Sequence, residues 1–277
     1  MLGKLMKYDF RCMIRKFGPL WLGLLALAAV NGFTVGHVLD NGNVEGFLKF
    51  LFGVVPIILL FALWVATCVM MIMFVCERFY KGLLGDEGYL MFTLPATPAE
   101  HIGSKLIVAL VMELITGLVA LAAMLTFVMI YDGAGFIQGL RELGELLSRW
   151  GELPRGTTGL LVQLFLLAMA AAVCTDLQIY LAISLGHLAR KNRVAMSVIA
   201  FVGINVALSL LLSAIAPLLG RIDFNLNVSF DTFNEAMNAI VRYGSKVIWV
   251  MIAWTAVKSA GFFFGSDAIL TKKLNLE

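Results

Sequence analysis

Charged residues are scarce in this chain. Only 14% of its 277 residues are Asp, Glu, Lys or Arg, whereas 61% are hydrophobic. An ordinary soluble domain carries roughly a quarter charged residues, and no soluble core could hide so much apolar surface. The composition therefore excludes a globular soluble protein, and the formal net charge of +3 is too small to indicate a nucleic-acid partner.

Motifs of known chemistry are missing as well. The four cysteines lie far apart without C-x-x-C spacing, which argues against a disulfide framework or a zinc site: Cys12, Cys68, Cys76 and Cys174. The three histidines are isolated, and the sequence has no G-x-x-x-x-G-K-[ST] loop for nucleotide phosphates. We therefore expect no metal, no cofactor and no enzymatic activity here, so that any ATP is hydrolysed by another subunit.

Long apolar runs fill most of the sequence. A helix of about twenty apolar residues matches the hydrocarbon core of a bilayer, which is roughly 30 Å thick. Six such runs are present, at 18–38, 51–76, 106–131, 158–186, 194–219 and 247–270. The connections are too short for an independent soluble core. We predict an all-α, multi-pass membrane protein whose single transmembrane domain takes in residues 1–277.

The basic residues are distributed unevenly around these spans. Of the 21 Lys and Arg residues, thirteen flank the spans on the side that holds both termini, seven lie on the other side, and Lys258 lies within a span. Cytoplasmic connections carry the excess of Lys and Arg. We therefore predict that both termini are cytoplasmic, together with the connections 77–105 and 187–193.

Residues 1–17 combine an apolar face with a basic one. Apolar side chains recur every three or four positions, and basic side chains fill the opposite face: Leu2, Met6, Phe10, Met13 and Phe17 against Lys4, Lys7, Arg11 and Arg15. This pattern is typical of an interfacial amphipathic helix. We predict that its basic face meets anionic lipid headgroups and that its apolar face enters the acyl boundary. A plain topology signal is the alternative.

Two connections on the opposite side also have helical periodicity. The apolar positions are Phe136, Leu140, Leu143, Leu147 and Trp150 in the first, and Phe230, Phe233, Met237 and Ile240 in the second. We predict two short helices on the outer rim. Packing against the ends of neighbouring spans is the expected role, and lining a substrate exit is the alternative.

Three ionisable residues lie well inside the predicted spans: Glu113, Asp176 and Lys258. Each costs roughly 2.5 to 3.5 kcal/mol to insert, so each needs a partner. Two interpretations remain open. The three charges line a polar path or proton relay, or they form an interhelical ion pair in which the long Lys258 side chain reaches a carboxylate.

The cytoplasmic connection at 77–105 is too apolar for a free linker. Gly85 and Gly88 bracket an acidic turn at Asp86 and Glu87, and a dense apolar stretch begins at Tyr89. That apolar surface has to be covered, so we expect this loop to dock on a partner.

A helix start follows the loop. Thr97 has the position of an N-cap, Pro98 that of the first helical residue and Glu100 that of the third, which is the capping-box arrangement. We therefore predict that a helix begins in the cytoplasm at Pro98 and continues into the third span.

The loop resembles that of permease subunits in the ATP-binding-cassette (ABC) type-2 exporter family. Residues 78–95 fit the run R-F-Y-K-x-L-x-G-D-E-G-Y-L-x-F-T-L-P. The six-span layout with both ends inside, preceded by an amphipathic helix, is similar to that family too.

The resemblance implies a half-transporter in a bacterial plasma membrane. Two permease chains, identical or related, would form the pathway, and separate ATPase subunits would dock on the cytoplasmic loops. The substrate would be hydrophobic or amphipathic: a peptide, a lipid or a drug. The implied coupling residues are Gly85, Asp86, Glu87, Gly88, Tyr89, Thr97, Pro98 and Glu100.

Two other functions stay open at this point. An ion-coupled secondary transporter would use Glu113 and Asp176 as its coupling carboxylates. A non-transporting sensor or assembly component would use the same loop as a docking site.

Overall fold

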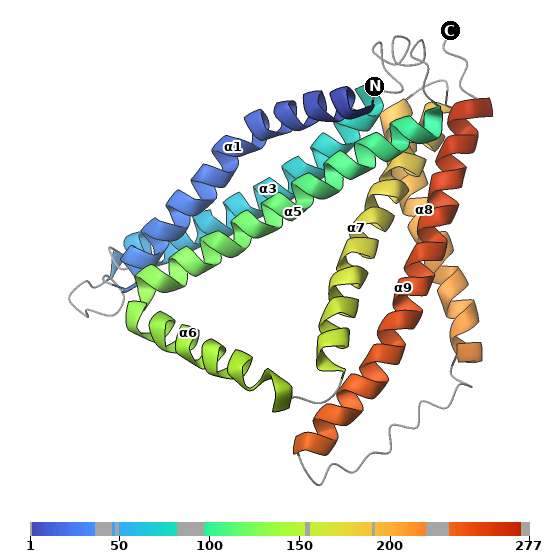
Figure 1. Ribbon diagram of the computed structural model, residues 1–277. Helices are drawn as coiled ribbons and strands as arrows, with labels where there is room; N and C mark the ends of the chain where they lie inside the picture. Colours follow the sequence, from blue (N-terminus) through green and yellow to red (C-terminus); the bar gives the residue numbers. More distant parts are fainter. Residues whose placement is uncertain are drawn as a thin grey trace. The chain divides into compact units, whose positions relative to one another are not determined.

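The computed structural model describes residues 2–36, 46–47, 50–81, 97–152, 156–189, 192–219 and 233–272, and these residues contain helices and no strand. The elements in chain order are α1 (Leu2–Thr34), the π-helix η2 (Phe50–Val54), α3 (Val55–Phe79), α5 (Pro98–Tyr131), α6 (Gly133–Ser148), the 3-10 helix η4 (Trp150–Glu152), α7 (Thr157–His187), α8 (Arg193–Leu219) and α9 (Phe233–Lys272) (Figure 1).

Six of these helical segments are long and apolar enough to cross a membrane, which confirms the predicted number of spans. They are Met6–Thr34, Phe50–Phe79, Pro98–Tyr131, Thr157–His187, Arg193–Ala214 and Val241–Thr271. At 1.5 Å per residue, the longest of them is about 50 Å long. Because the hydrocarbon core measures roughly 30 Å, such a helix must tilt or extend beyond it.

The chain divides into two compact units. The first comprises residues 1–75 and 107–152, and the second comprises residues 76–106 and 153–277. α3 and α5 therefore each contribute to both units.

The core of the first unit lies where α1, α3 and α5 meet. Its buried apolar side chains come from all three helices: Met13, Phe17, Met71, Phe74, Val108 and Met112. The rings of Phe17 and Phe74 meet edge to face, with their centroids 5.9 Å apart. Met6 and Phe10 pack against the same cluster. The apolar face predicted on residues 1–17 is thus directed at protein.

Polar contacts and one close approach hold α1 against its neighbours. The Asn31 side-chain amide donates to the carbonyl oxygen of Pro56 on α3 at 2.9 Å, and the Trp21 indole donates to the Thr116 hydroxyl on α5 at 3.3 Å. At Gly32, an added Cβ would lie 2.8 Å from the Cβ of Ile130, so only glycine permits this crossing of α1 and α5. Small residues have this role in many membrane helix pairs.

α1 is one helix of 33 residues with Pro19 inside it. Proline removes a backbone hydrogen bond and its ring crowds the carbonyl four residues earlier, which bends a helix. Figure 1 shows α1 bending along its length. The boundary that we predicted between an interfacial helix at 1–17 and a span at 18–38 therefore falls inside one continuous helix.

In the second unit, α7 packs along both α9 and α8 (Figure 1). The Gln163 side-chain amide donates to the Ser245 hydroxyl at 2.8 Å, which joins α7 to α9. At Gly186, an added Cβ would lie 2.5 Å from the backbone nitrogen of Ser197, so α7 and α8 approach closely there. The buried residues of α7 lie between Cys174 and Gly186, in its second half.

Of the two short helices that we predicted on the outer rim, one is present as a separate helix and the other is not. Residues 133–148 form the separate helix α6, as predicted, but none of these residues is buried. The expected packing against the ends of neighbouring spans is therefore not seen within the first unit. Residues 233–240 are the first turns of α9, which continues to Lys272, so they are not a separate helix.

Candidate functional site

The candidate site is formed by the residues that flank the connection at 82–96, which lies outside the described residues. We define the loop junction as residues 76–81 at the end of α3, residues 97–105 at the start of α5, and residues 176–187 of α7, all within the second unit. The rings of Phe79 and Tyr180 stack face to face at 4.2 Å between centroids, and both side chains are fully buried. Tyr80 meets His187 edge to face at 5.7 Å. The end of α3 is thereby fixed on α7.

The start of α5 has the predicted capping box. The Thr97 backbone nitrogen donates to Glu100 Oε2 at 2.9 Å, and the Glu100 nitrogen donates back to Thr97 Oγ1 at 3.3 Å. Pro98 is the first helical residue. Such a cap stabilises a helix end by about 1 kcal/mol. The helix then continues to Tyr131, as the sequence predicts.

Several ionisable side chains are buried in the loop junction. Lys105 is 6% exposed, Asp176 is 2% exposed and His101 is 1% exposed. Each of them takes part in a polar, ring or electrostatic contact, as does Arg78. Asp176, Tyr180 and Ser184 follow one another at intervals of four residues and so share one face of α7. This face is where α7 meets the end of α3.

Buried charges are costly unless they are well partnered, and removing one partner leaves the other uncompensated. The loop junction is consequently a place where a small displacement has a large electrostatic cost. Among the described residues, no three His, Cys, Asp or Glu side chains are grouped as metal ligands.

His101 and Lys105 were not predicted as site residues from the sequence. The available signal was their i, i+4 spacing directly after the capping box, which places both on one face of the first turns of α5. Five of the predicted coupling residues lie outside the described residues: Gly85, Asp86, Glu87, Gly88 and Tyr89. The structure therefore describes the two ends of the loop and not its tip.

Two of the three predicted intramembrane charges, Asp176 and Lys258, lie in the second unit, at different places. Asp176 belongs to the loop junction, and half-buried Lys258 holds its ammonium 6.0 Å from the ring centroid of Trp254 on its own helix. Within the described part of the second unit, no ion pair joins Lys258 to Asp176. Glu113 is half-buried on α5 in the first unit.

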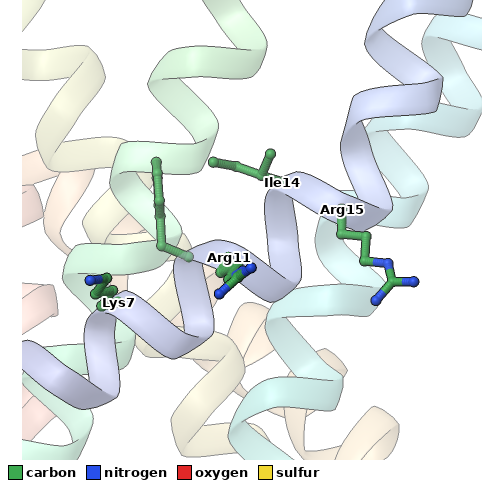
Figure 2. Close-up of a pocket in the computed structure, with 5 residues that line it drawn as sticks. Lys7, Arg11, Ile14 and Arg15 are labelled. Atoms are coloured by element: carbon green, nitrogen blue, oxygen red, sulfur yellow. The ribbon is translucent and has the colours of Figure 1, made fainter.

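The outer side of α1 carries a basic strip. Lys7, Arg11 and Arg15 are exposed on successive turns, and with Phe10 and Ile14 they line a shallow hollow (Figure 2). Cationic groups beside apolar side chains provide the chemistry that an anionic lipid requires, with the headgroup on the cations and the chain on the apolar residues.

A second hollow, of about 600 Å³, lies between α1, α3 and α5 in the first unit. Ten residues line it, and all of them are apolar or aromatic: Leu24, Ile57, Leu60, Phe61, Trp64, Ala120, Leu121, Ala123, Met124 and Phe127. A lining of this kind favours a hydrocarbon ligand over a polar one.

The described residues define the class of the protein as an all-helical, multi-pass membrane protein with six candidate spans. No protein-family model matches the chain, and neither a curated protein nor a solved structure does.

Proposed function

We propose that this chain is the membrane-spanning permease subunit of an ATP-driven exporter of the ABC type, with ATP hydrolysis on a separate subunit. The observation that carries the proposal is the loop junction. The residues on both sides of 82–96 belong to one unit, with Phe79 stacked on Tyr180 on one side and His101 and Ile102 buried in the first turns of α5 on the other.

A loop held in this way is suited to transmit force. Because Phe79 and Tyr180 are stacked and buried, the end of α3 cannot shift without moving α7. α7 in turn packs on α8 and α9, so a displacement of the loop reaches three spans. In the proposal, the acidic turn at Asp86 and Glu87 contacts the ATPase, and ATP binding moves the loop and switches the spans between two states.

The distribution of basic residues and the resemblance of the 78–95 run to ABC type-2 permeases support the rest of the proposal. Both termini and the loop lie in the cytoplasm of a bacterial cell, on the side with the excess of basic residues. A second permease chain, identical or related, completes the pathway. The substrate is hydrophobic or amphipathic, such as a peptide, a lipid or a drug, and the apolar hollow in the first unit supports this class. Membrane lipid binds the basic strip of α1.

A double charge reversal tests the coupling role of the loop. Asp86→Lys combined with Glu87→Lys is expected to abolish association with the ATPase, because the acidic turn would repel the surface that it is proposed to bind. The matched control is Glu142→Lys with Glu145→Lys, which reverses two exposed acidic residues of α6. ATPase activity that copurifies with the tagged chain is the readout, and a monodisperse detergent extract shows that each variant folds. Unchanged copurifying activity in the loop variant would refute the coupling assignment.

The gradient dependence of transport separates the proposal from the carrier alternative. An ABC exporter requires ATP, so transport into inverted vesicles should continue when the proton gradient is collapsed. The variants Glu113→Gln and Asp176→Asn should leave that independence unchanged. Transport that requires the gradient and loses this requirement in either variant would favour an ion-coupled carrier.

A further inference from the structure

α6 has a wide apolar face whose leucines are largely exposed. Leu140, Leu143 and Leu147 are 53%, 55% and 57% exposed, Phe136 is half-buried, and none of residues 133–148 is buried. At 100° per residue, Phe136, Leu140, Leu143, Leu147 and Trp150 fall on a single side of the helix. Left in water, a face of this size would be an aggregation site.

The opposite side of α6 is polar and balanced in charge. It carries Arg141 and Arg149 together with Glu142 and Glu145, two groups of each sign. Attraction to a charged surface therefore contributes little to where this helix lies. Whatever covers the apolar face must therefore bind it through apolar contacts.

The position of α6 in the chain places it directly after one span and shortly before the next. The α5 span ends at Tyr131, and only Asp132 separates it from the start of α6 at Gly133. The Asp132 carboxylate accepts a hydrogen bond from the Gly135 nitrogen at 2.9 Å, so a new helix can begin at once in a new direction. Figure 1 shows α6 leaving the end of α5 at a steep angle. The next span begins at Thr157, which returns the chain to the bilayer.

We infer that α6 is an interfacial helix that lies along the bilayer surface at the outer end of α5, with its apolar face in the lipid acyl region. A helix that directly follows a span and turns away from it lies in the headgroup layer, where one side meets water and the other meets hydrocarbon. Trp150 just beyond its end has the amphipathic ring that is enriched at this depth. The inference depends on the membrane fold and not on the proposed exporter function.

Bilayer lipid is a better occupant than a second copy of the chain. The apolar face covers about half of the helix circumference and is interrupted by no charged residue. A face of that width is wider than the stripe that one partner helix covers. It is the width that a helix half-sunk in a surface requires.

Spin labels can test this placement directly. In a background without the four native cysteines, Leu143→Cys and Glu145→Cys put labels on nearly opposite sides of α6. After reconstitution into lipid vesicles, collision with oxygen, which partitions into lipid, is compared with collision with a water-soluble nickel chelate. We expect a several-fold higher ratio of oxygen to nickel collisions at 143 than at 145. Leu140→Cys serves as a second label on the apolar side.

Two results would overturn the inference. Strong nickel collisions at 140 and 143 would place the apolar face in water. Weak collisions with both reagents at these positions would show that protein covers the face.

Discussion

Two helical segments of this molecule, the first half of α1 and α6, have the same amphipathic sequence pattern. Their apolar faces differ in how far they are buried. In the first half of α1 the apolar face is covered by α3 and α5, with Phe17 only 1% exposed. In α6 the equivalent face is open, with Leu143 55% exposed. The apolar residues have the same helical spacing in both.

The difference comes from what each helix is attached to. α1 is one continuous helix from its first turns into its span. Its early turns therefore pack against the neighbouring helices α3 and α5. α6 is separated from α5 by the Asp132 cap and follows a new direction. Periodicity therefore identifies an apolar face, and continuity with the adjacent span decides whether protein or lipid covers it.

Truncating one side chain in each helix should give the largest difference between the two. Phe17→Ala empties a covered position against Phe74 and should lower the free energy of unfolding by about 3 to 5 kcal/mol. Leu143→Ala removes a side chain that touches no protein core and should change it by only about 0.5 kcal/mol. Unfolding in mixed detergent micelles measures both values. Equal losses at the two positions would show that α6 is covered.

Added methyl groups at glycine give a smaller contrast. At Gly32, a Cβ would lie 2.8 Å from Ile130 Cβ and from the Phe127 carbonyl oxygen, so Gly32→Ala should destabilise the α1–α5 crossing by about 1 to 3 kcal/mol. At Gly139 on α6, no described atom lies within 4 Å of the added group. Gly139→Ala should therefore stabilise that helix by about 0.5 to 1 kcal/mol.

Thermal unfolding of the two glycine variants in the same detergent checks the sign of each effect. A Gly32→Ala protein as stable as the parent would contradict the close approach of α1 and α5.

Removing the two helix caps has a local effect that differs between a helix start that is buried and one that is not. Thr97→Ala and Asp132→Ala each remove a side-chain cap and should each cost about 1 kcal/mol locally. Fraying should stop early in α5, because His101 and Ile102 are buried in its first turns. It should spread along α6, which has no buried residue in 133–148.

Amide hydrogen exchange resolves the two outcomes segment by segment. Thr97→Ser and Asp132→Asn keep a capping oxygen and are the matched controls. Increased exchange confined to the first turn of α6 in Asp132→Ala would argue that other contacts support this helix.

Much of the fold could be predicted from the sequence because each membrane span is a continuous apolar run that can be identified without knowing its neighbours. Length and composition alone predicted six spans, and the capping box at Thr97 and Glu100 was confirmed. Both features depend on residues close together in the chain. The separate helix at 133–148 was predicted for the same reason.

Long-range features could not be predicted in this way. The burial of Lys105 and His101, and of Asp9 on the inner face of α1, depends on which helices pack together, and periodicity carries no information on that. The stacking of Phe79 on Tyr180 joins residues about a hundred positions apart and had no local signature. Residues 233–240 were predicted from their apolar periodicity to be a separate short helix, but they are the first turns of α9, which continues to Lys272.

Copurification with stoichiometry tests the central proposal most directly. The chain, tagged in its native host and extracted in mild detergent, should bring down a P-loop ATPase at one copy per permease chain. The charge reversal Asp86→Lys with Glu87→Lys should lose that ATPase while the extracted chain stays monodisperse. A chain that transports its substrate with no ATPase bound under several mild conditions would contradict the exporter assignment.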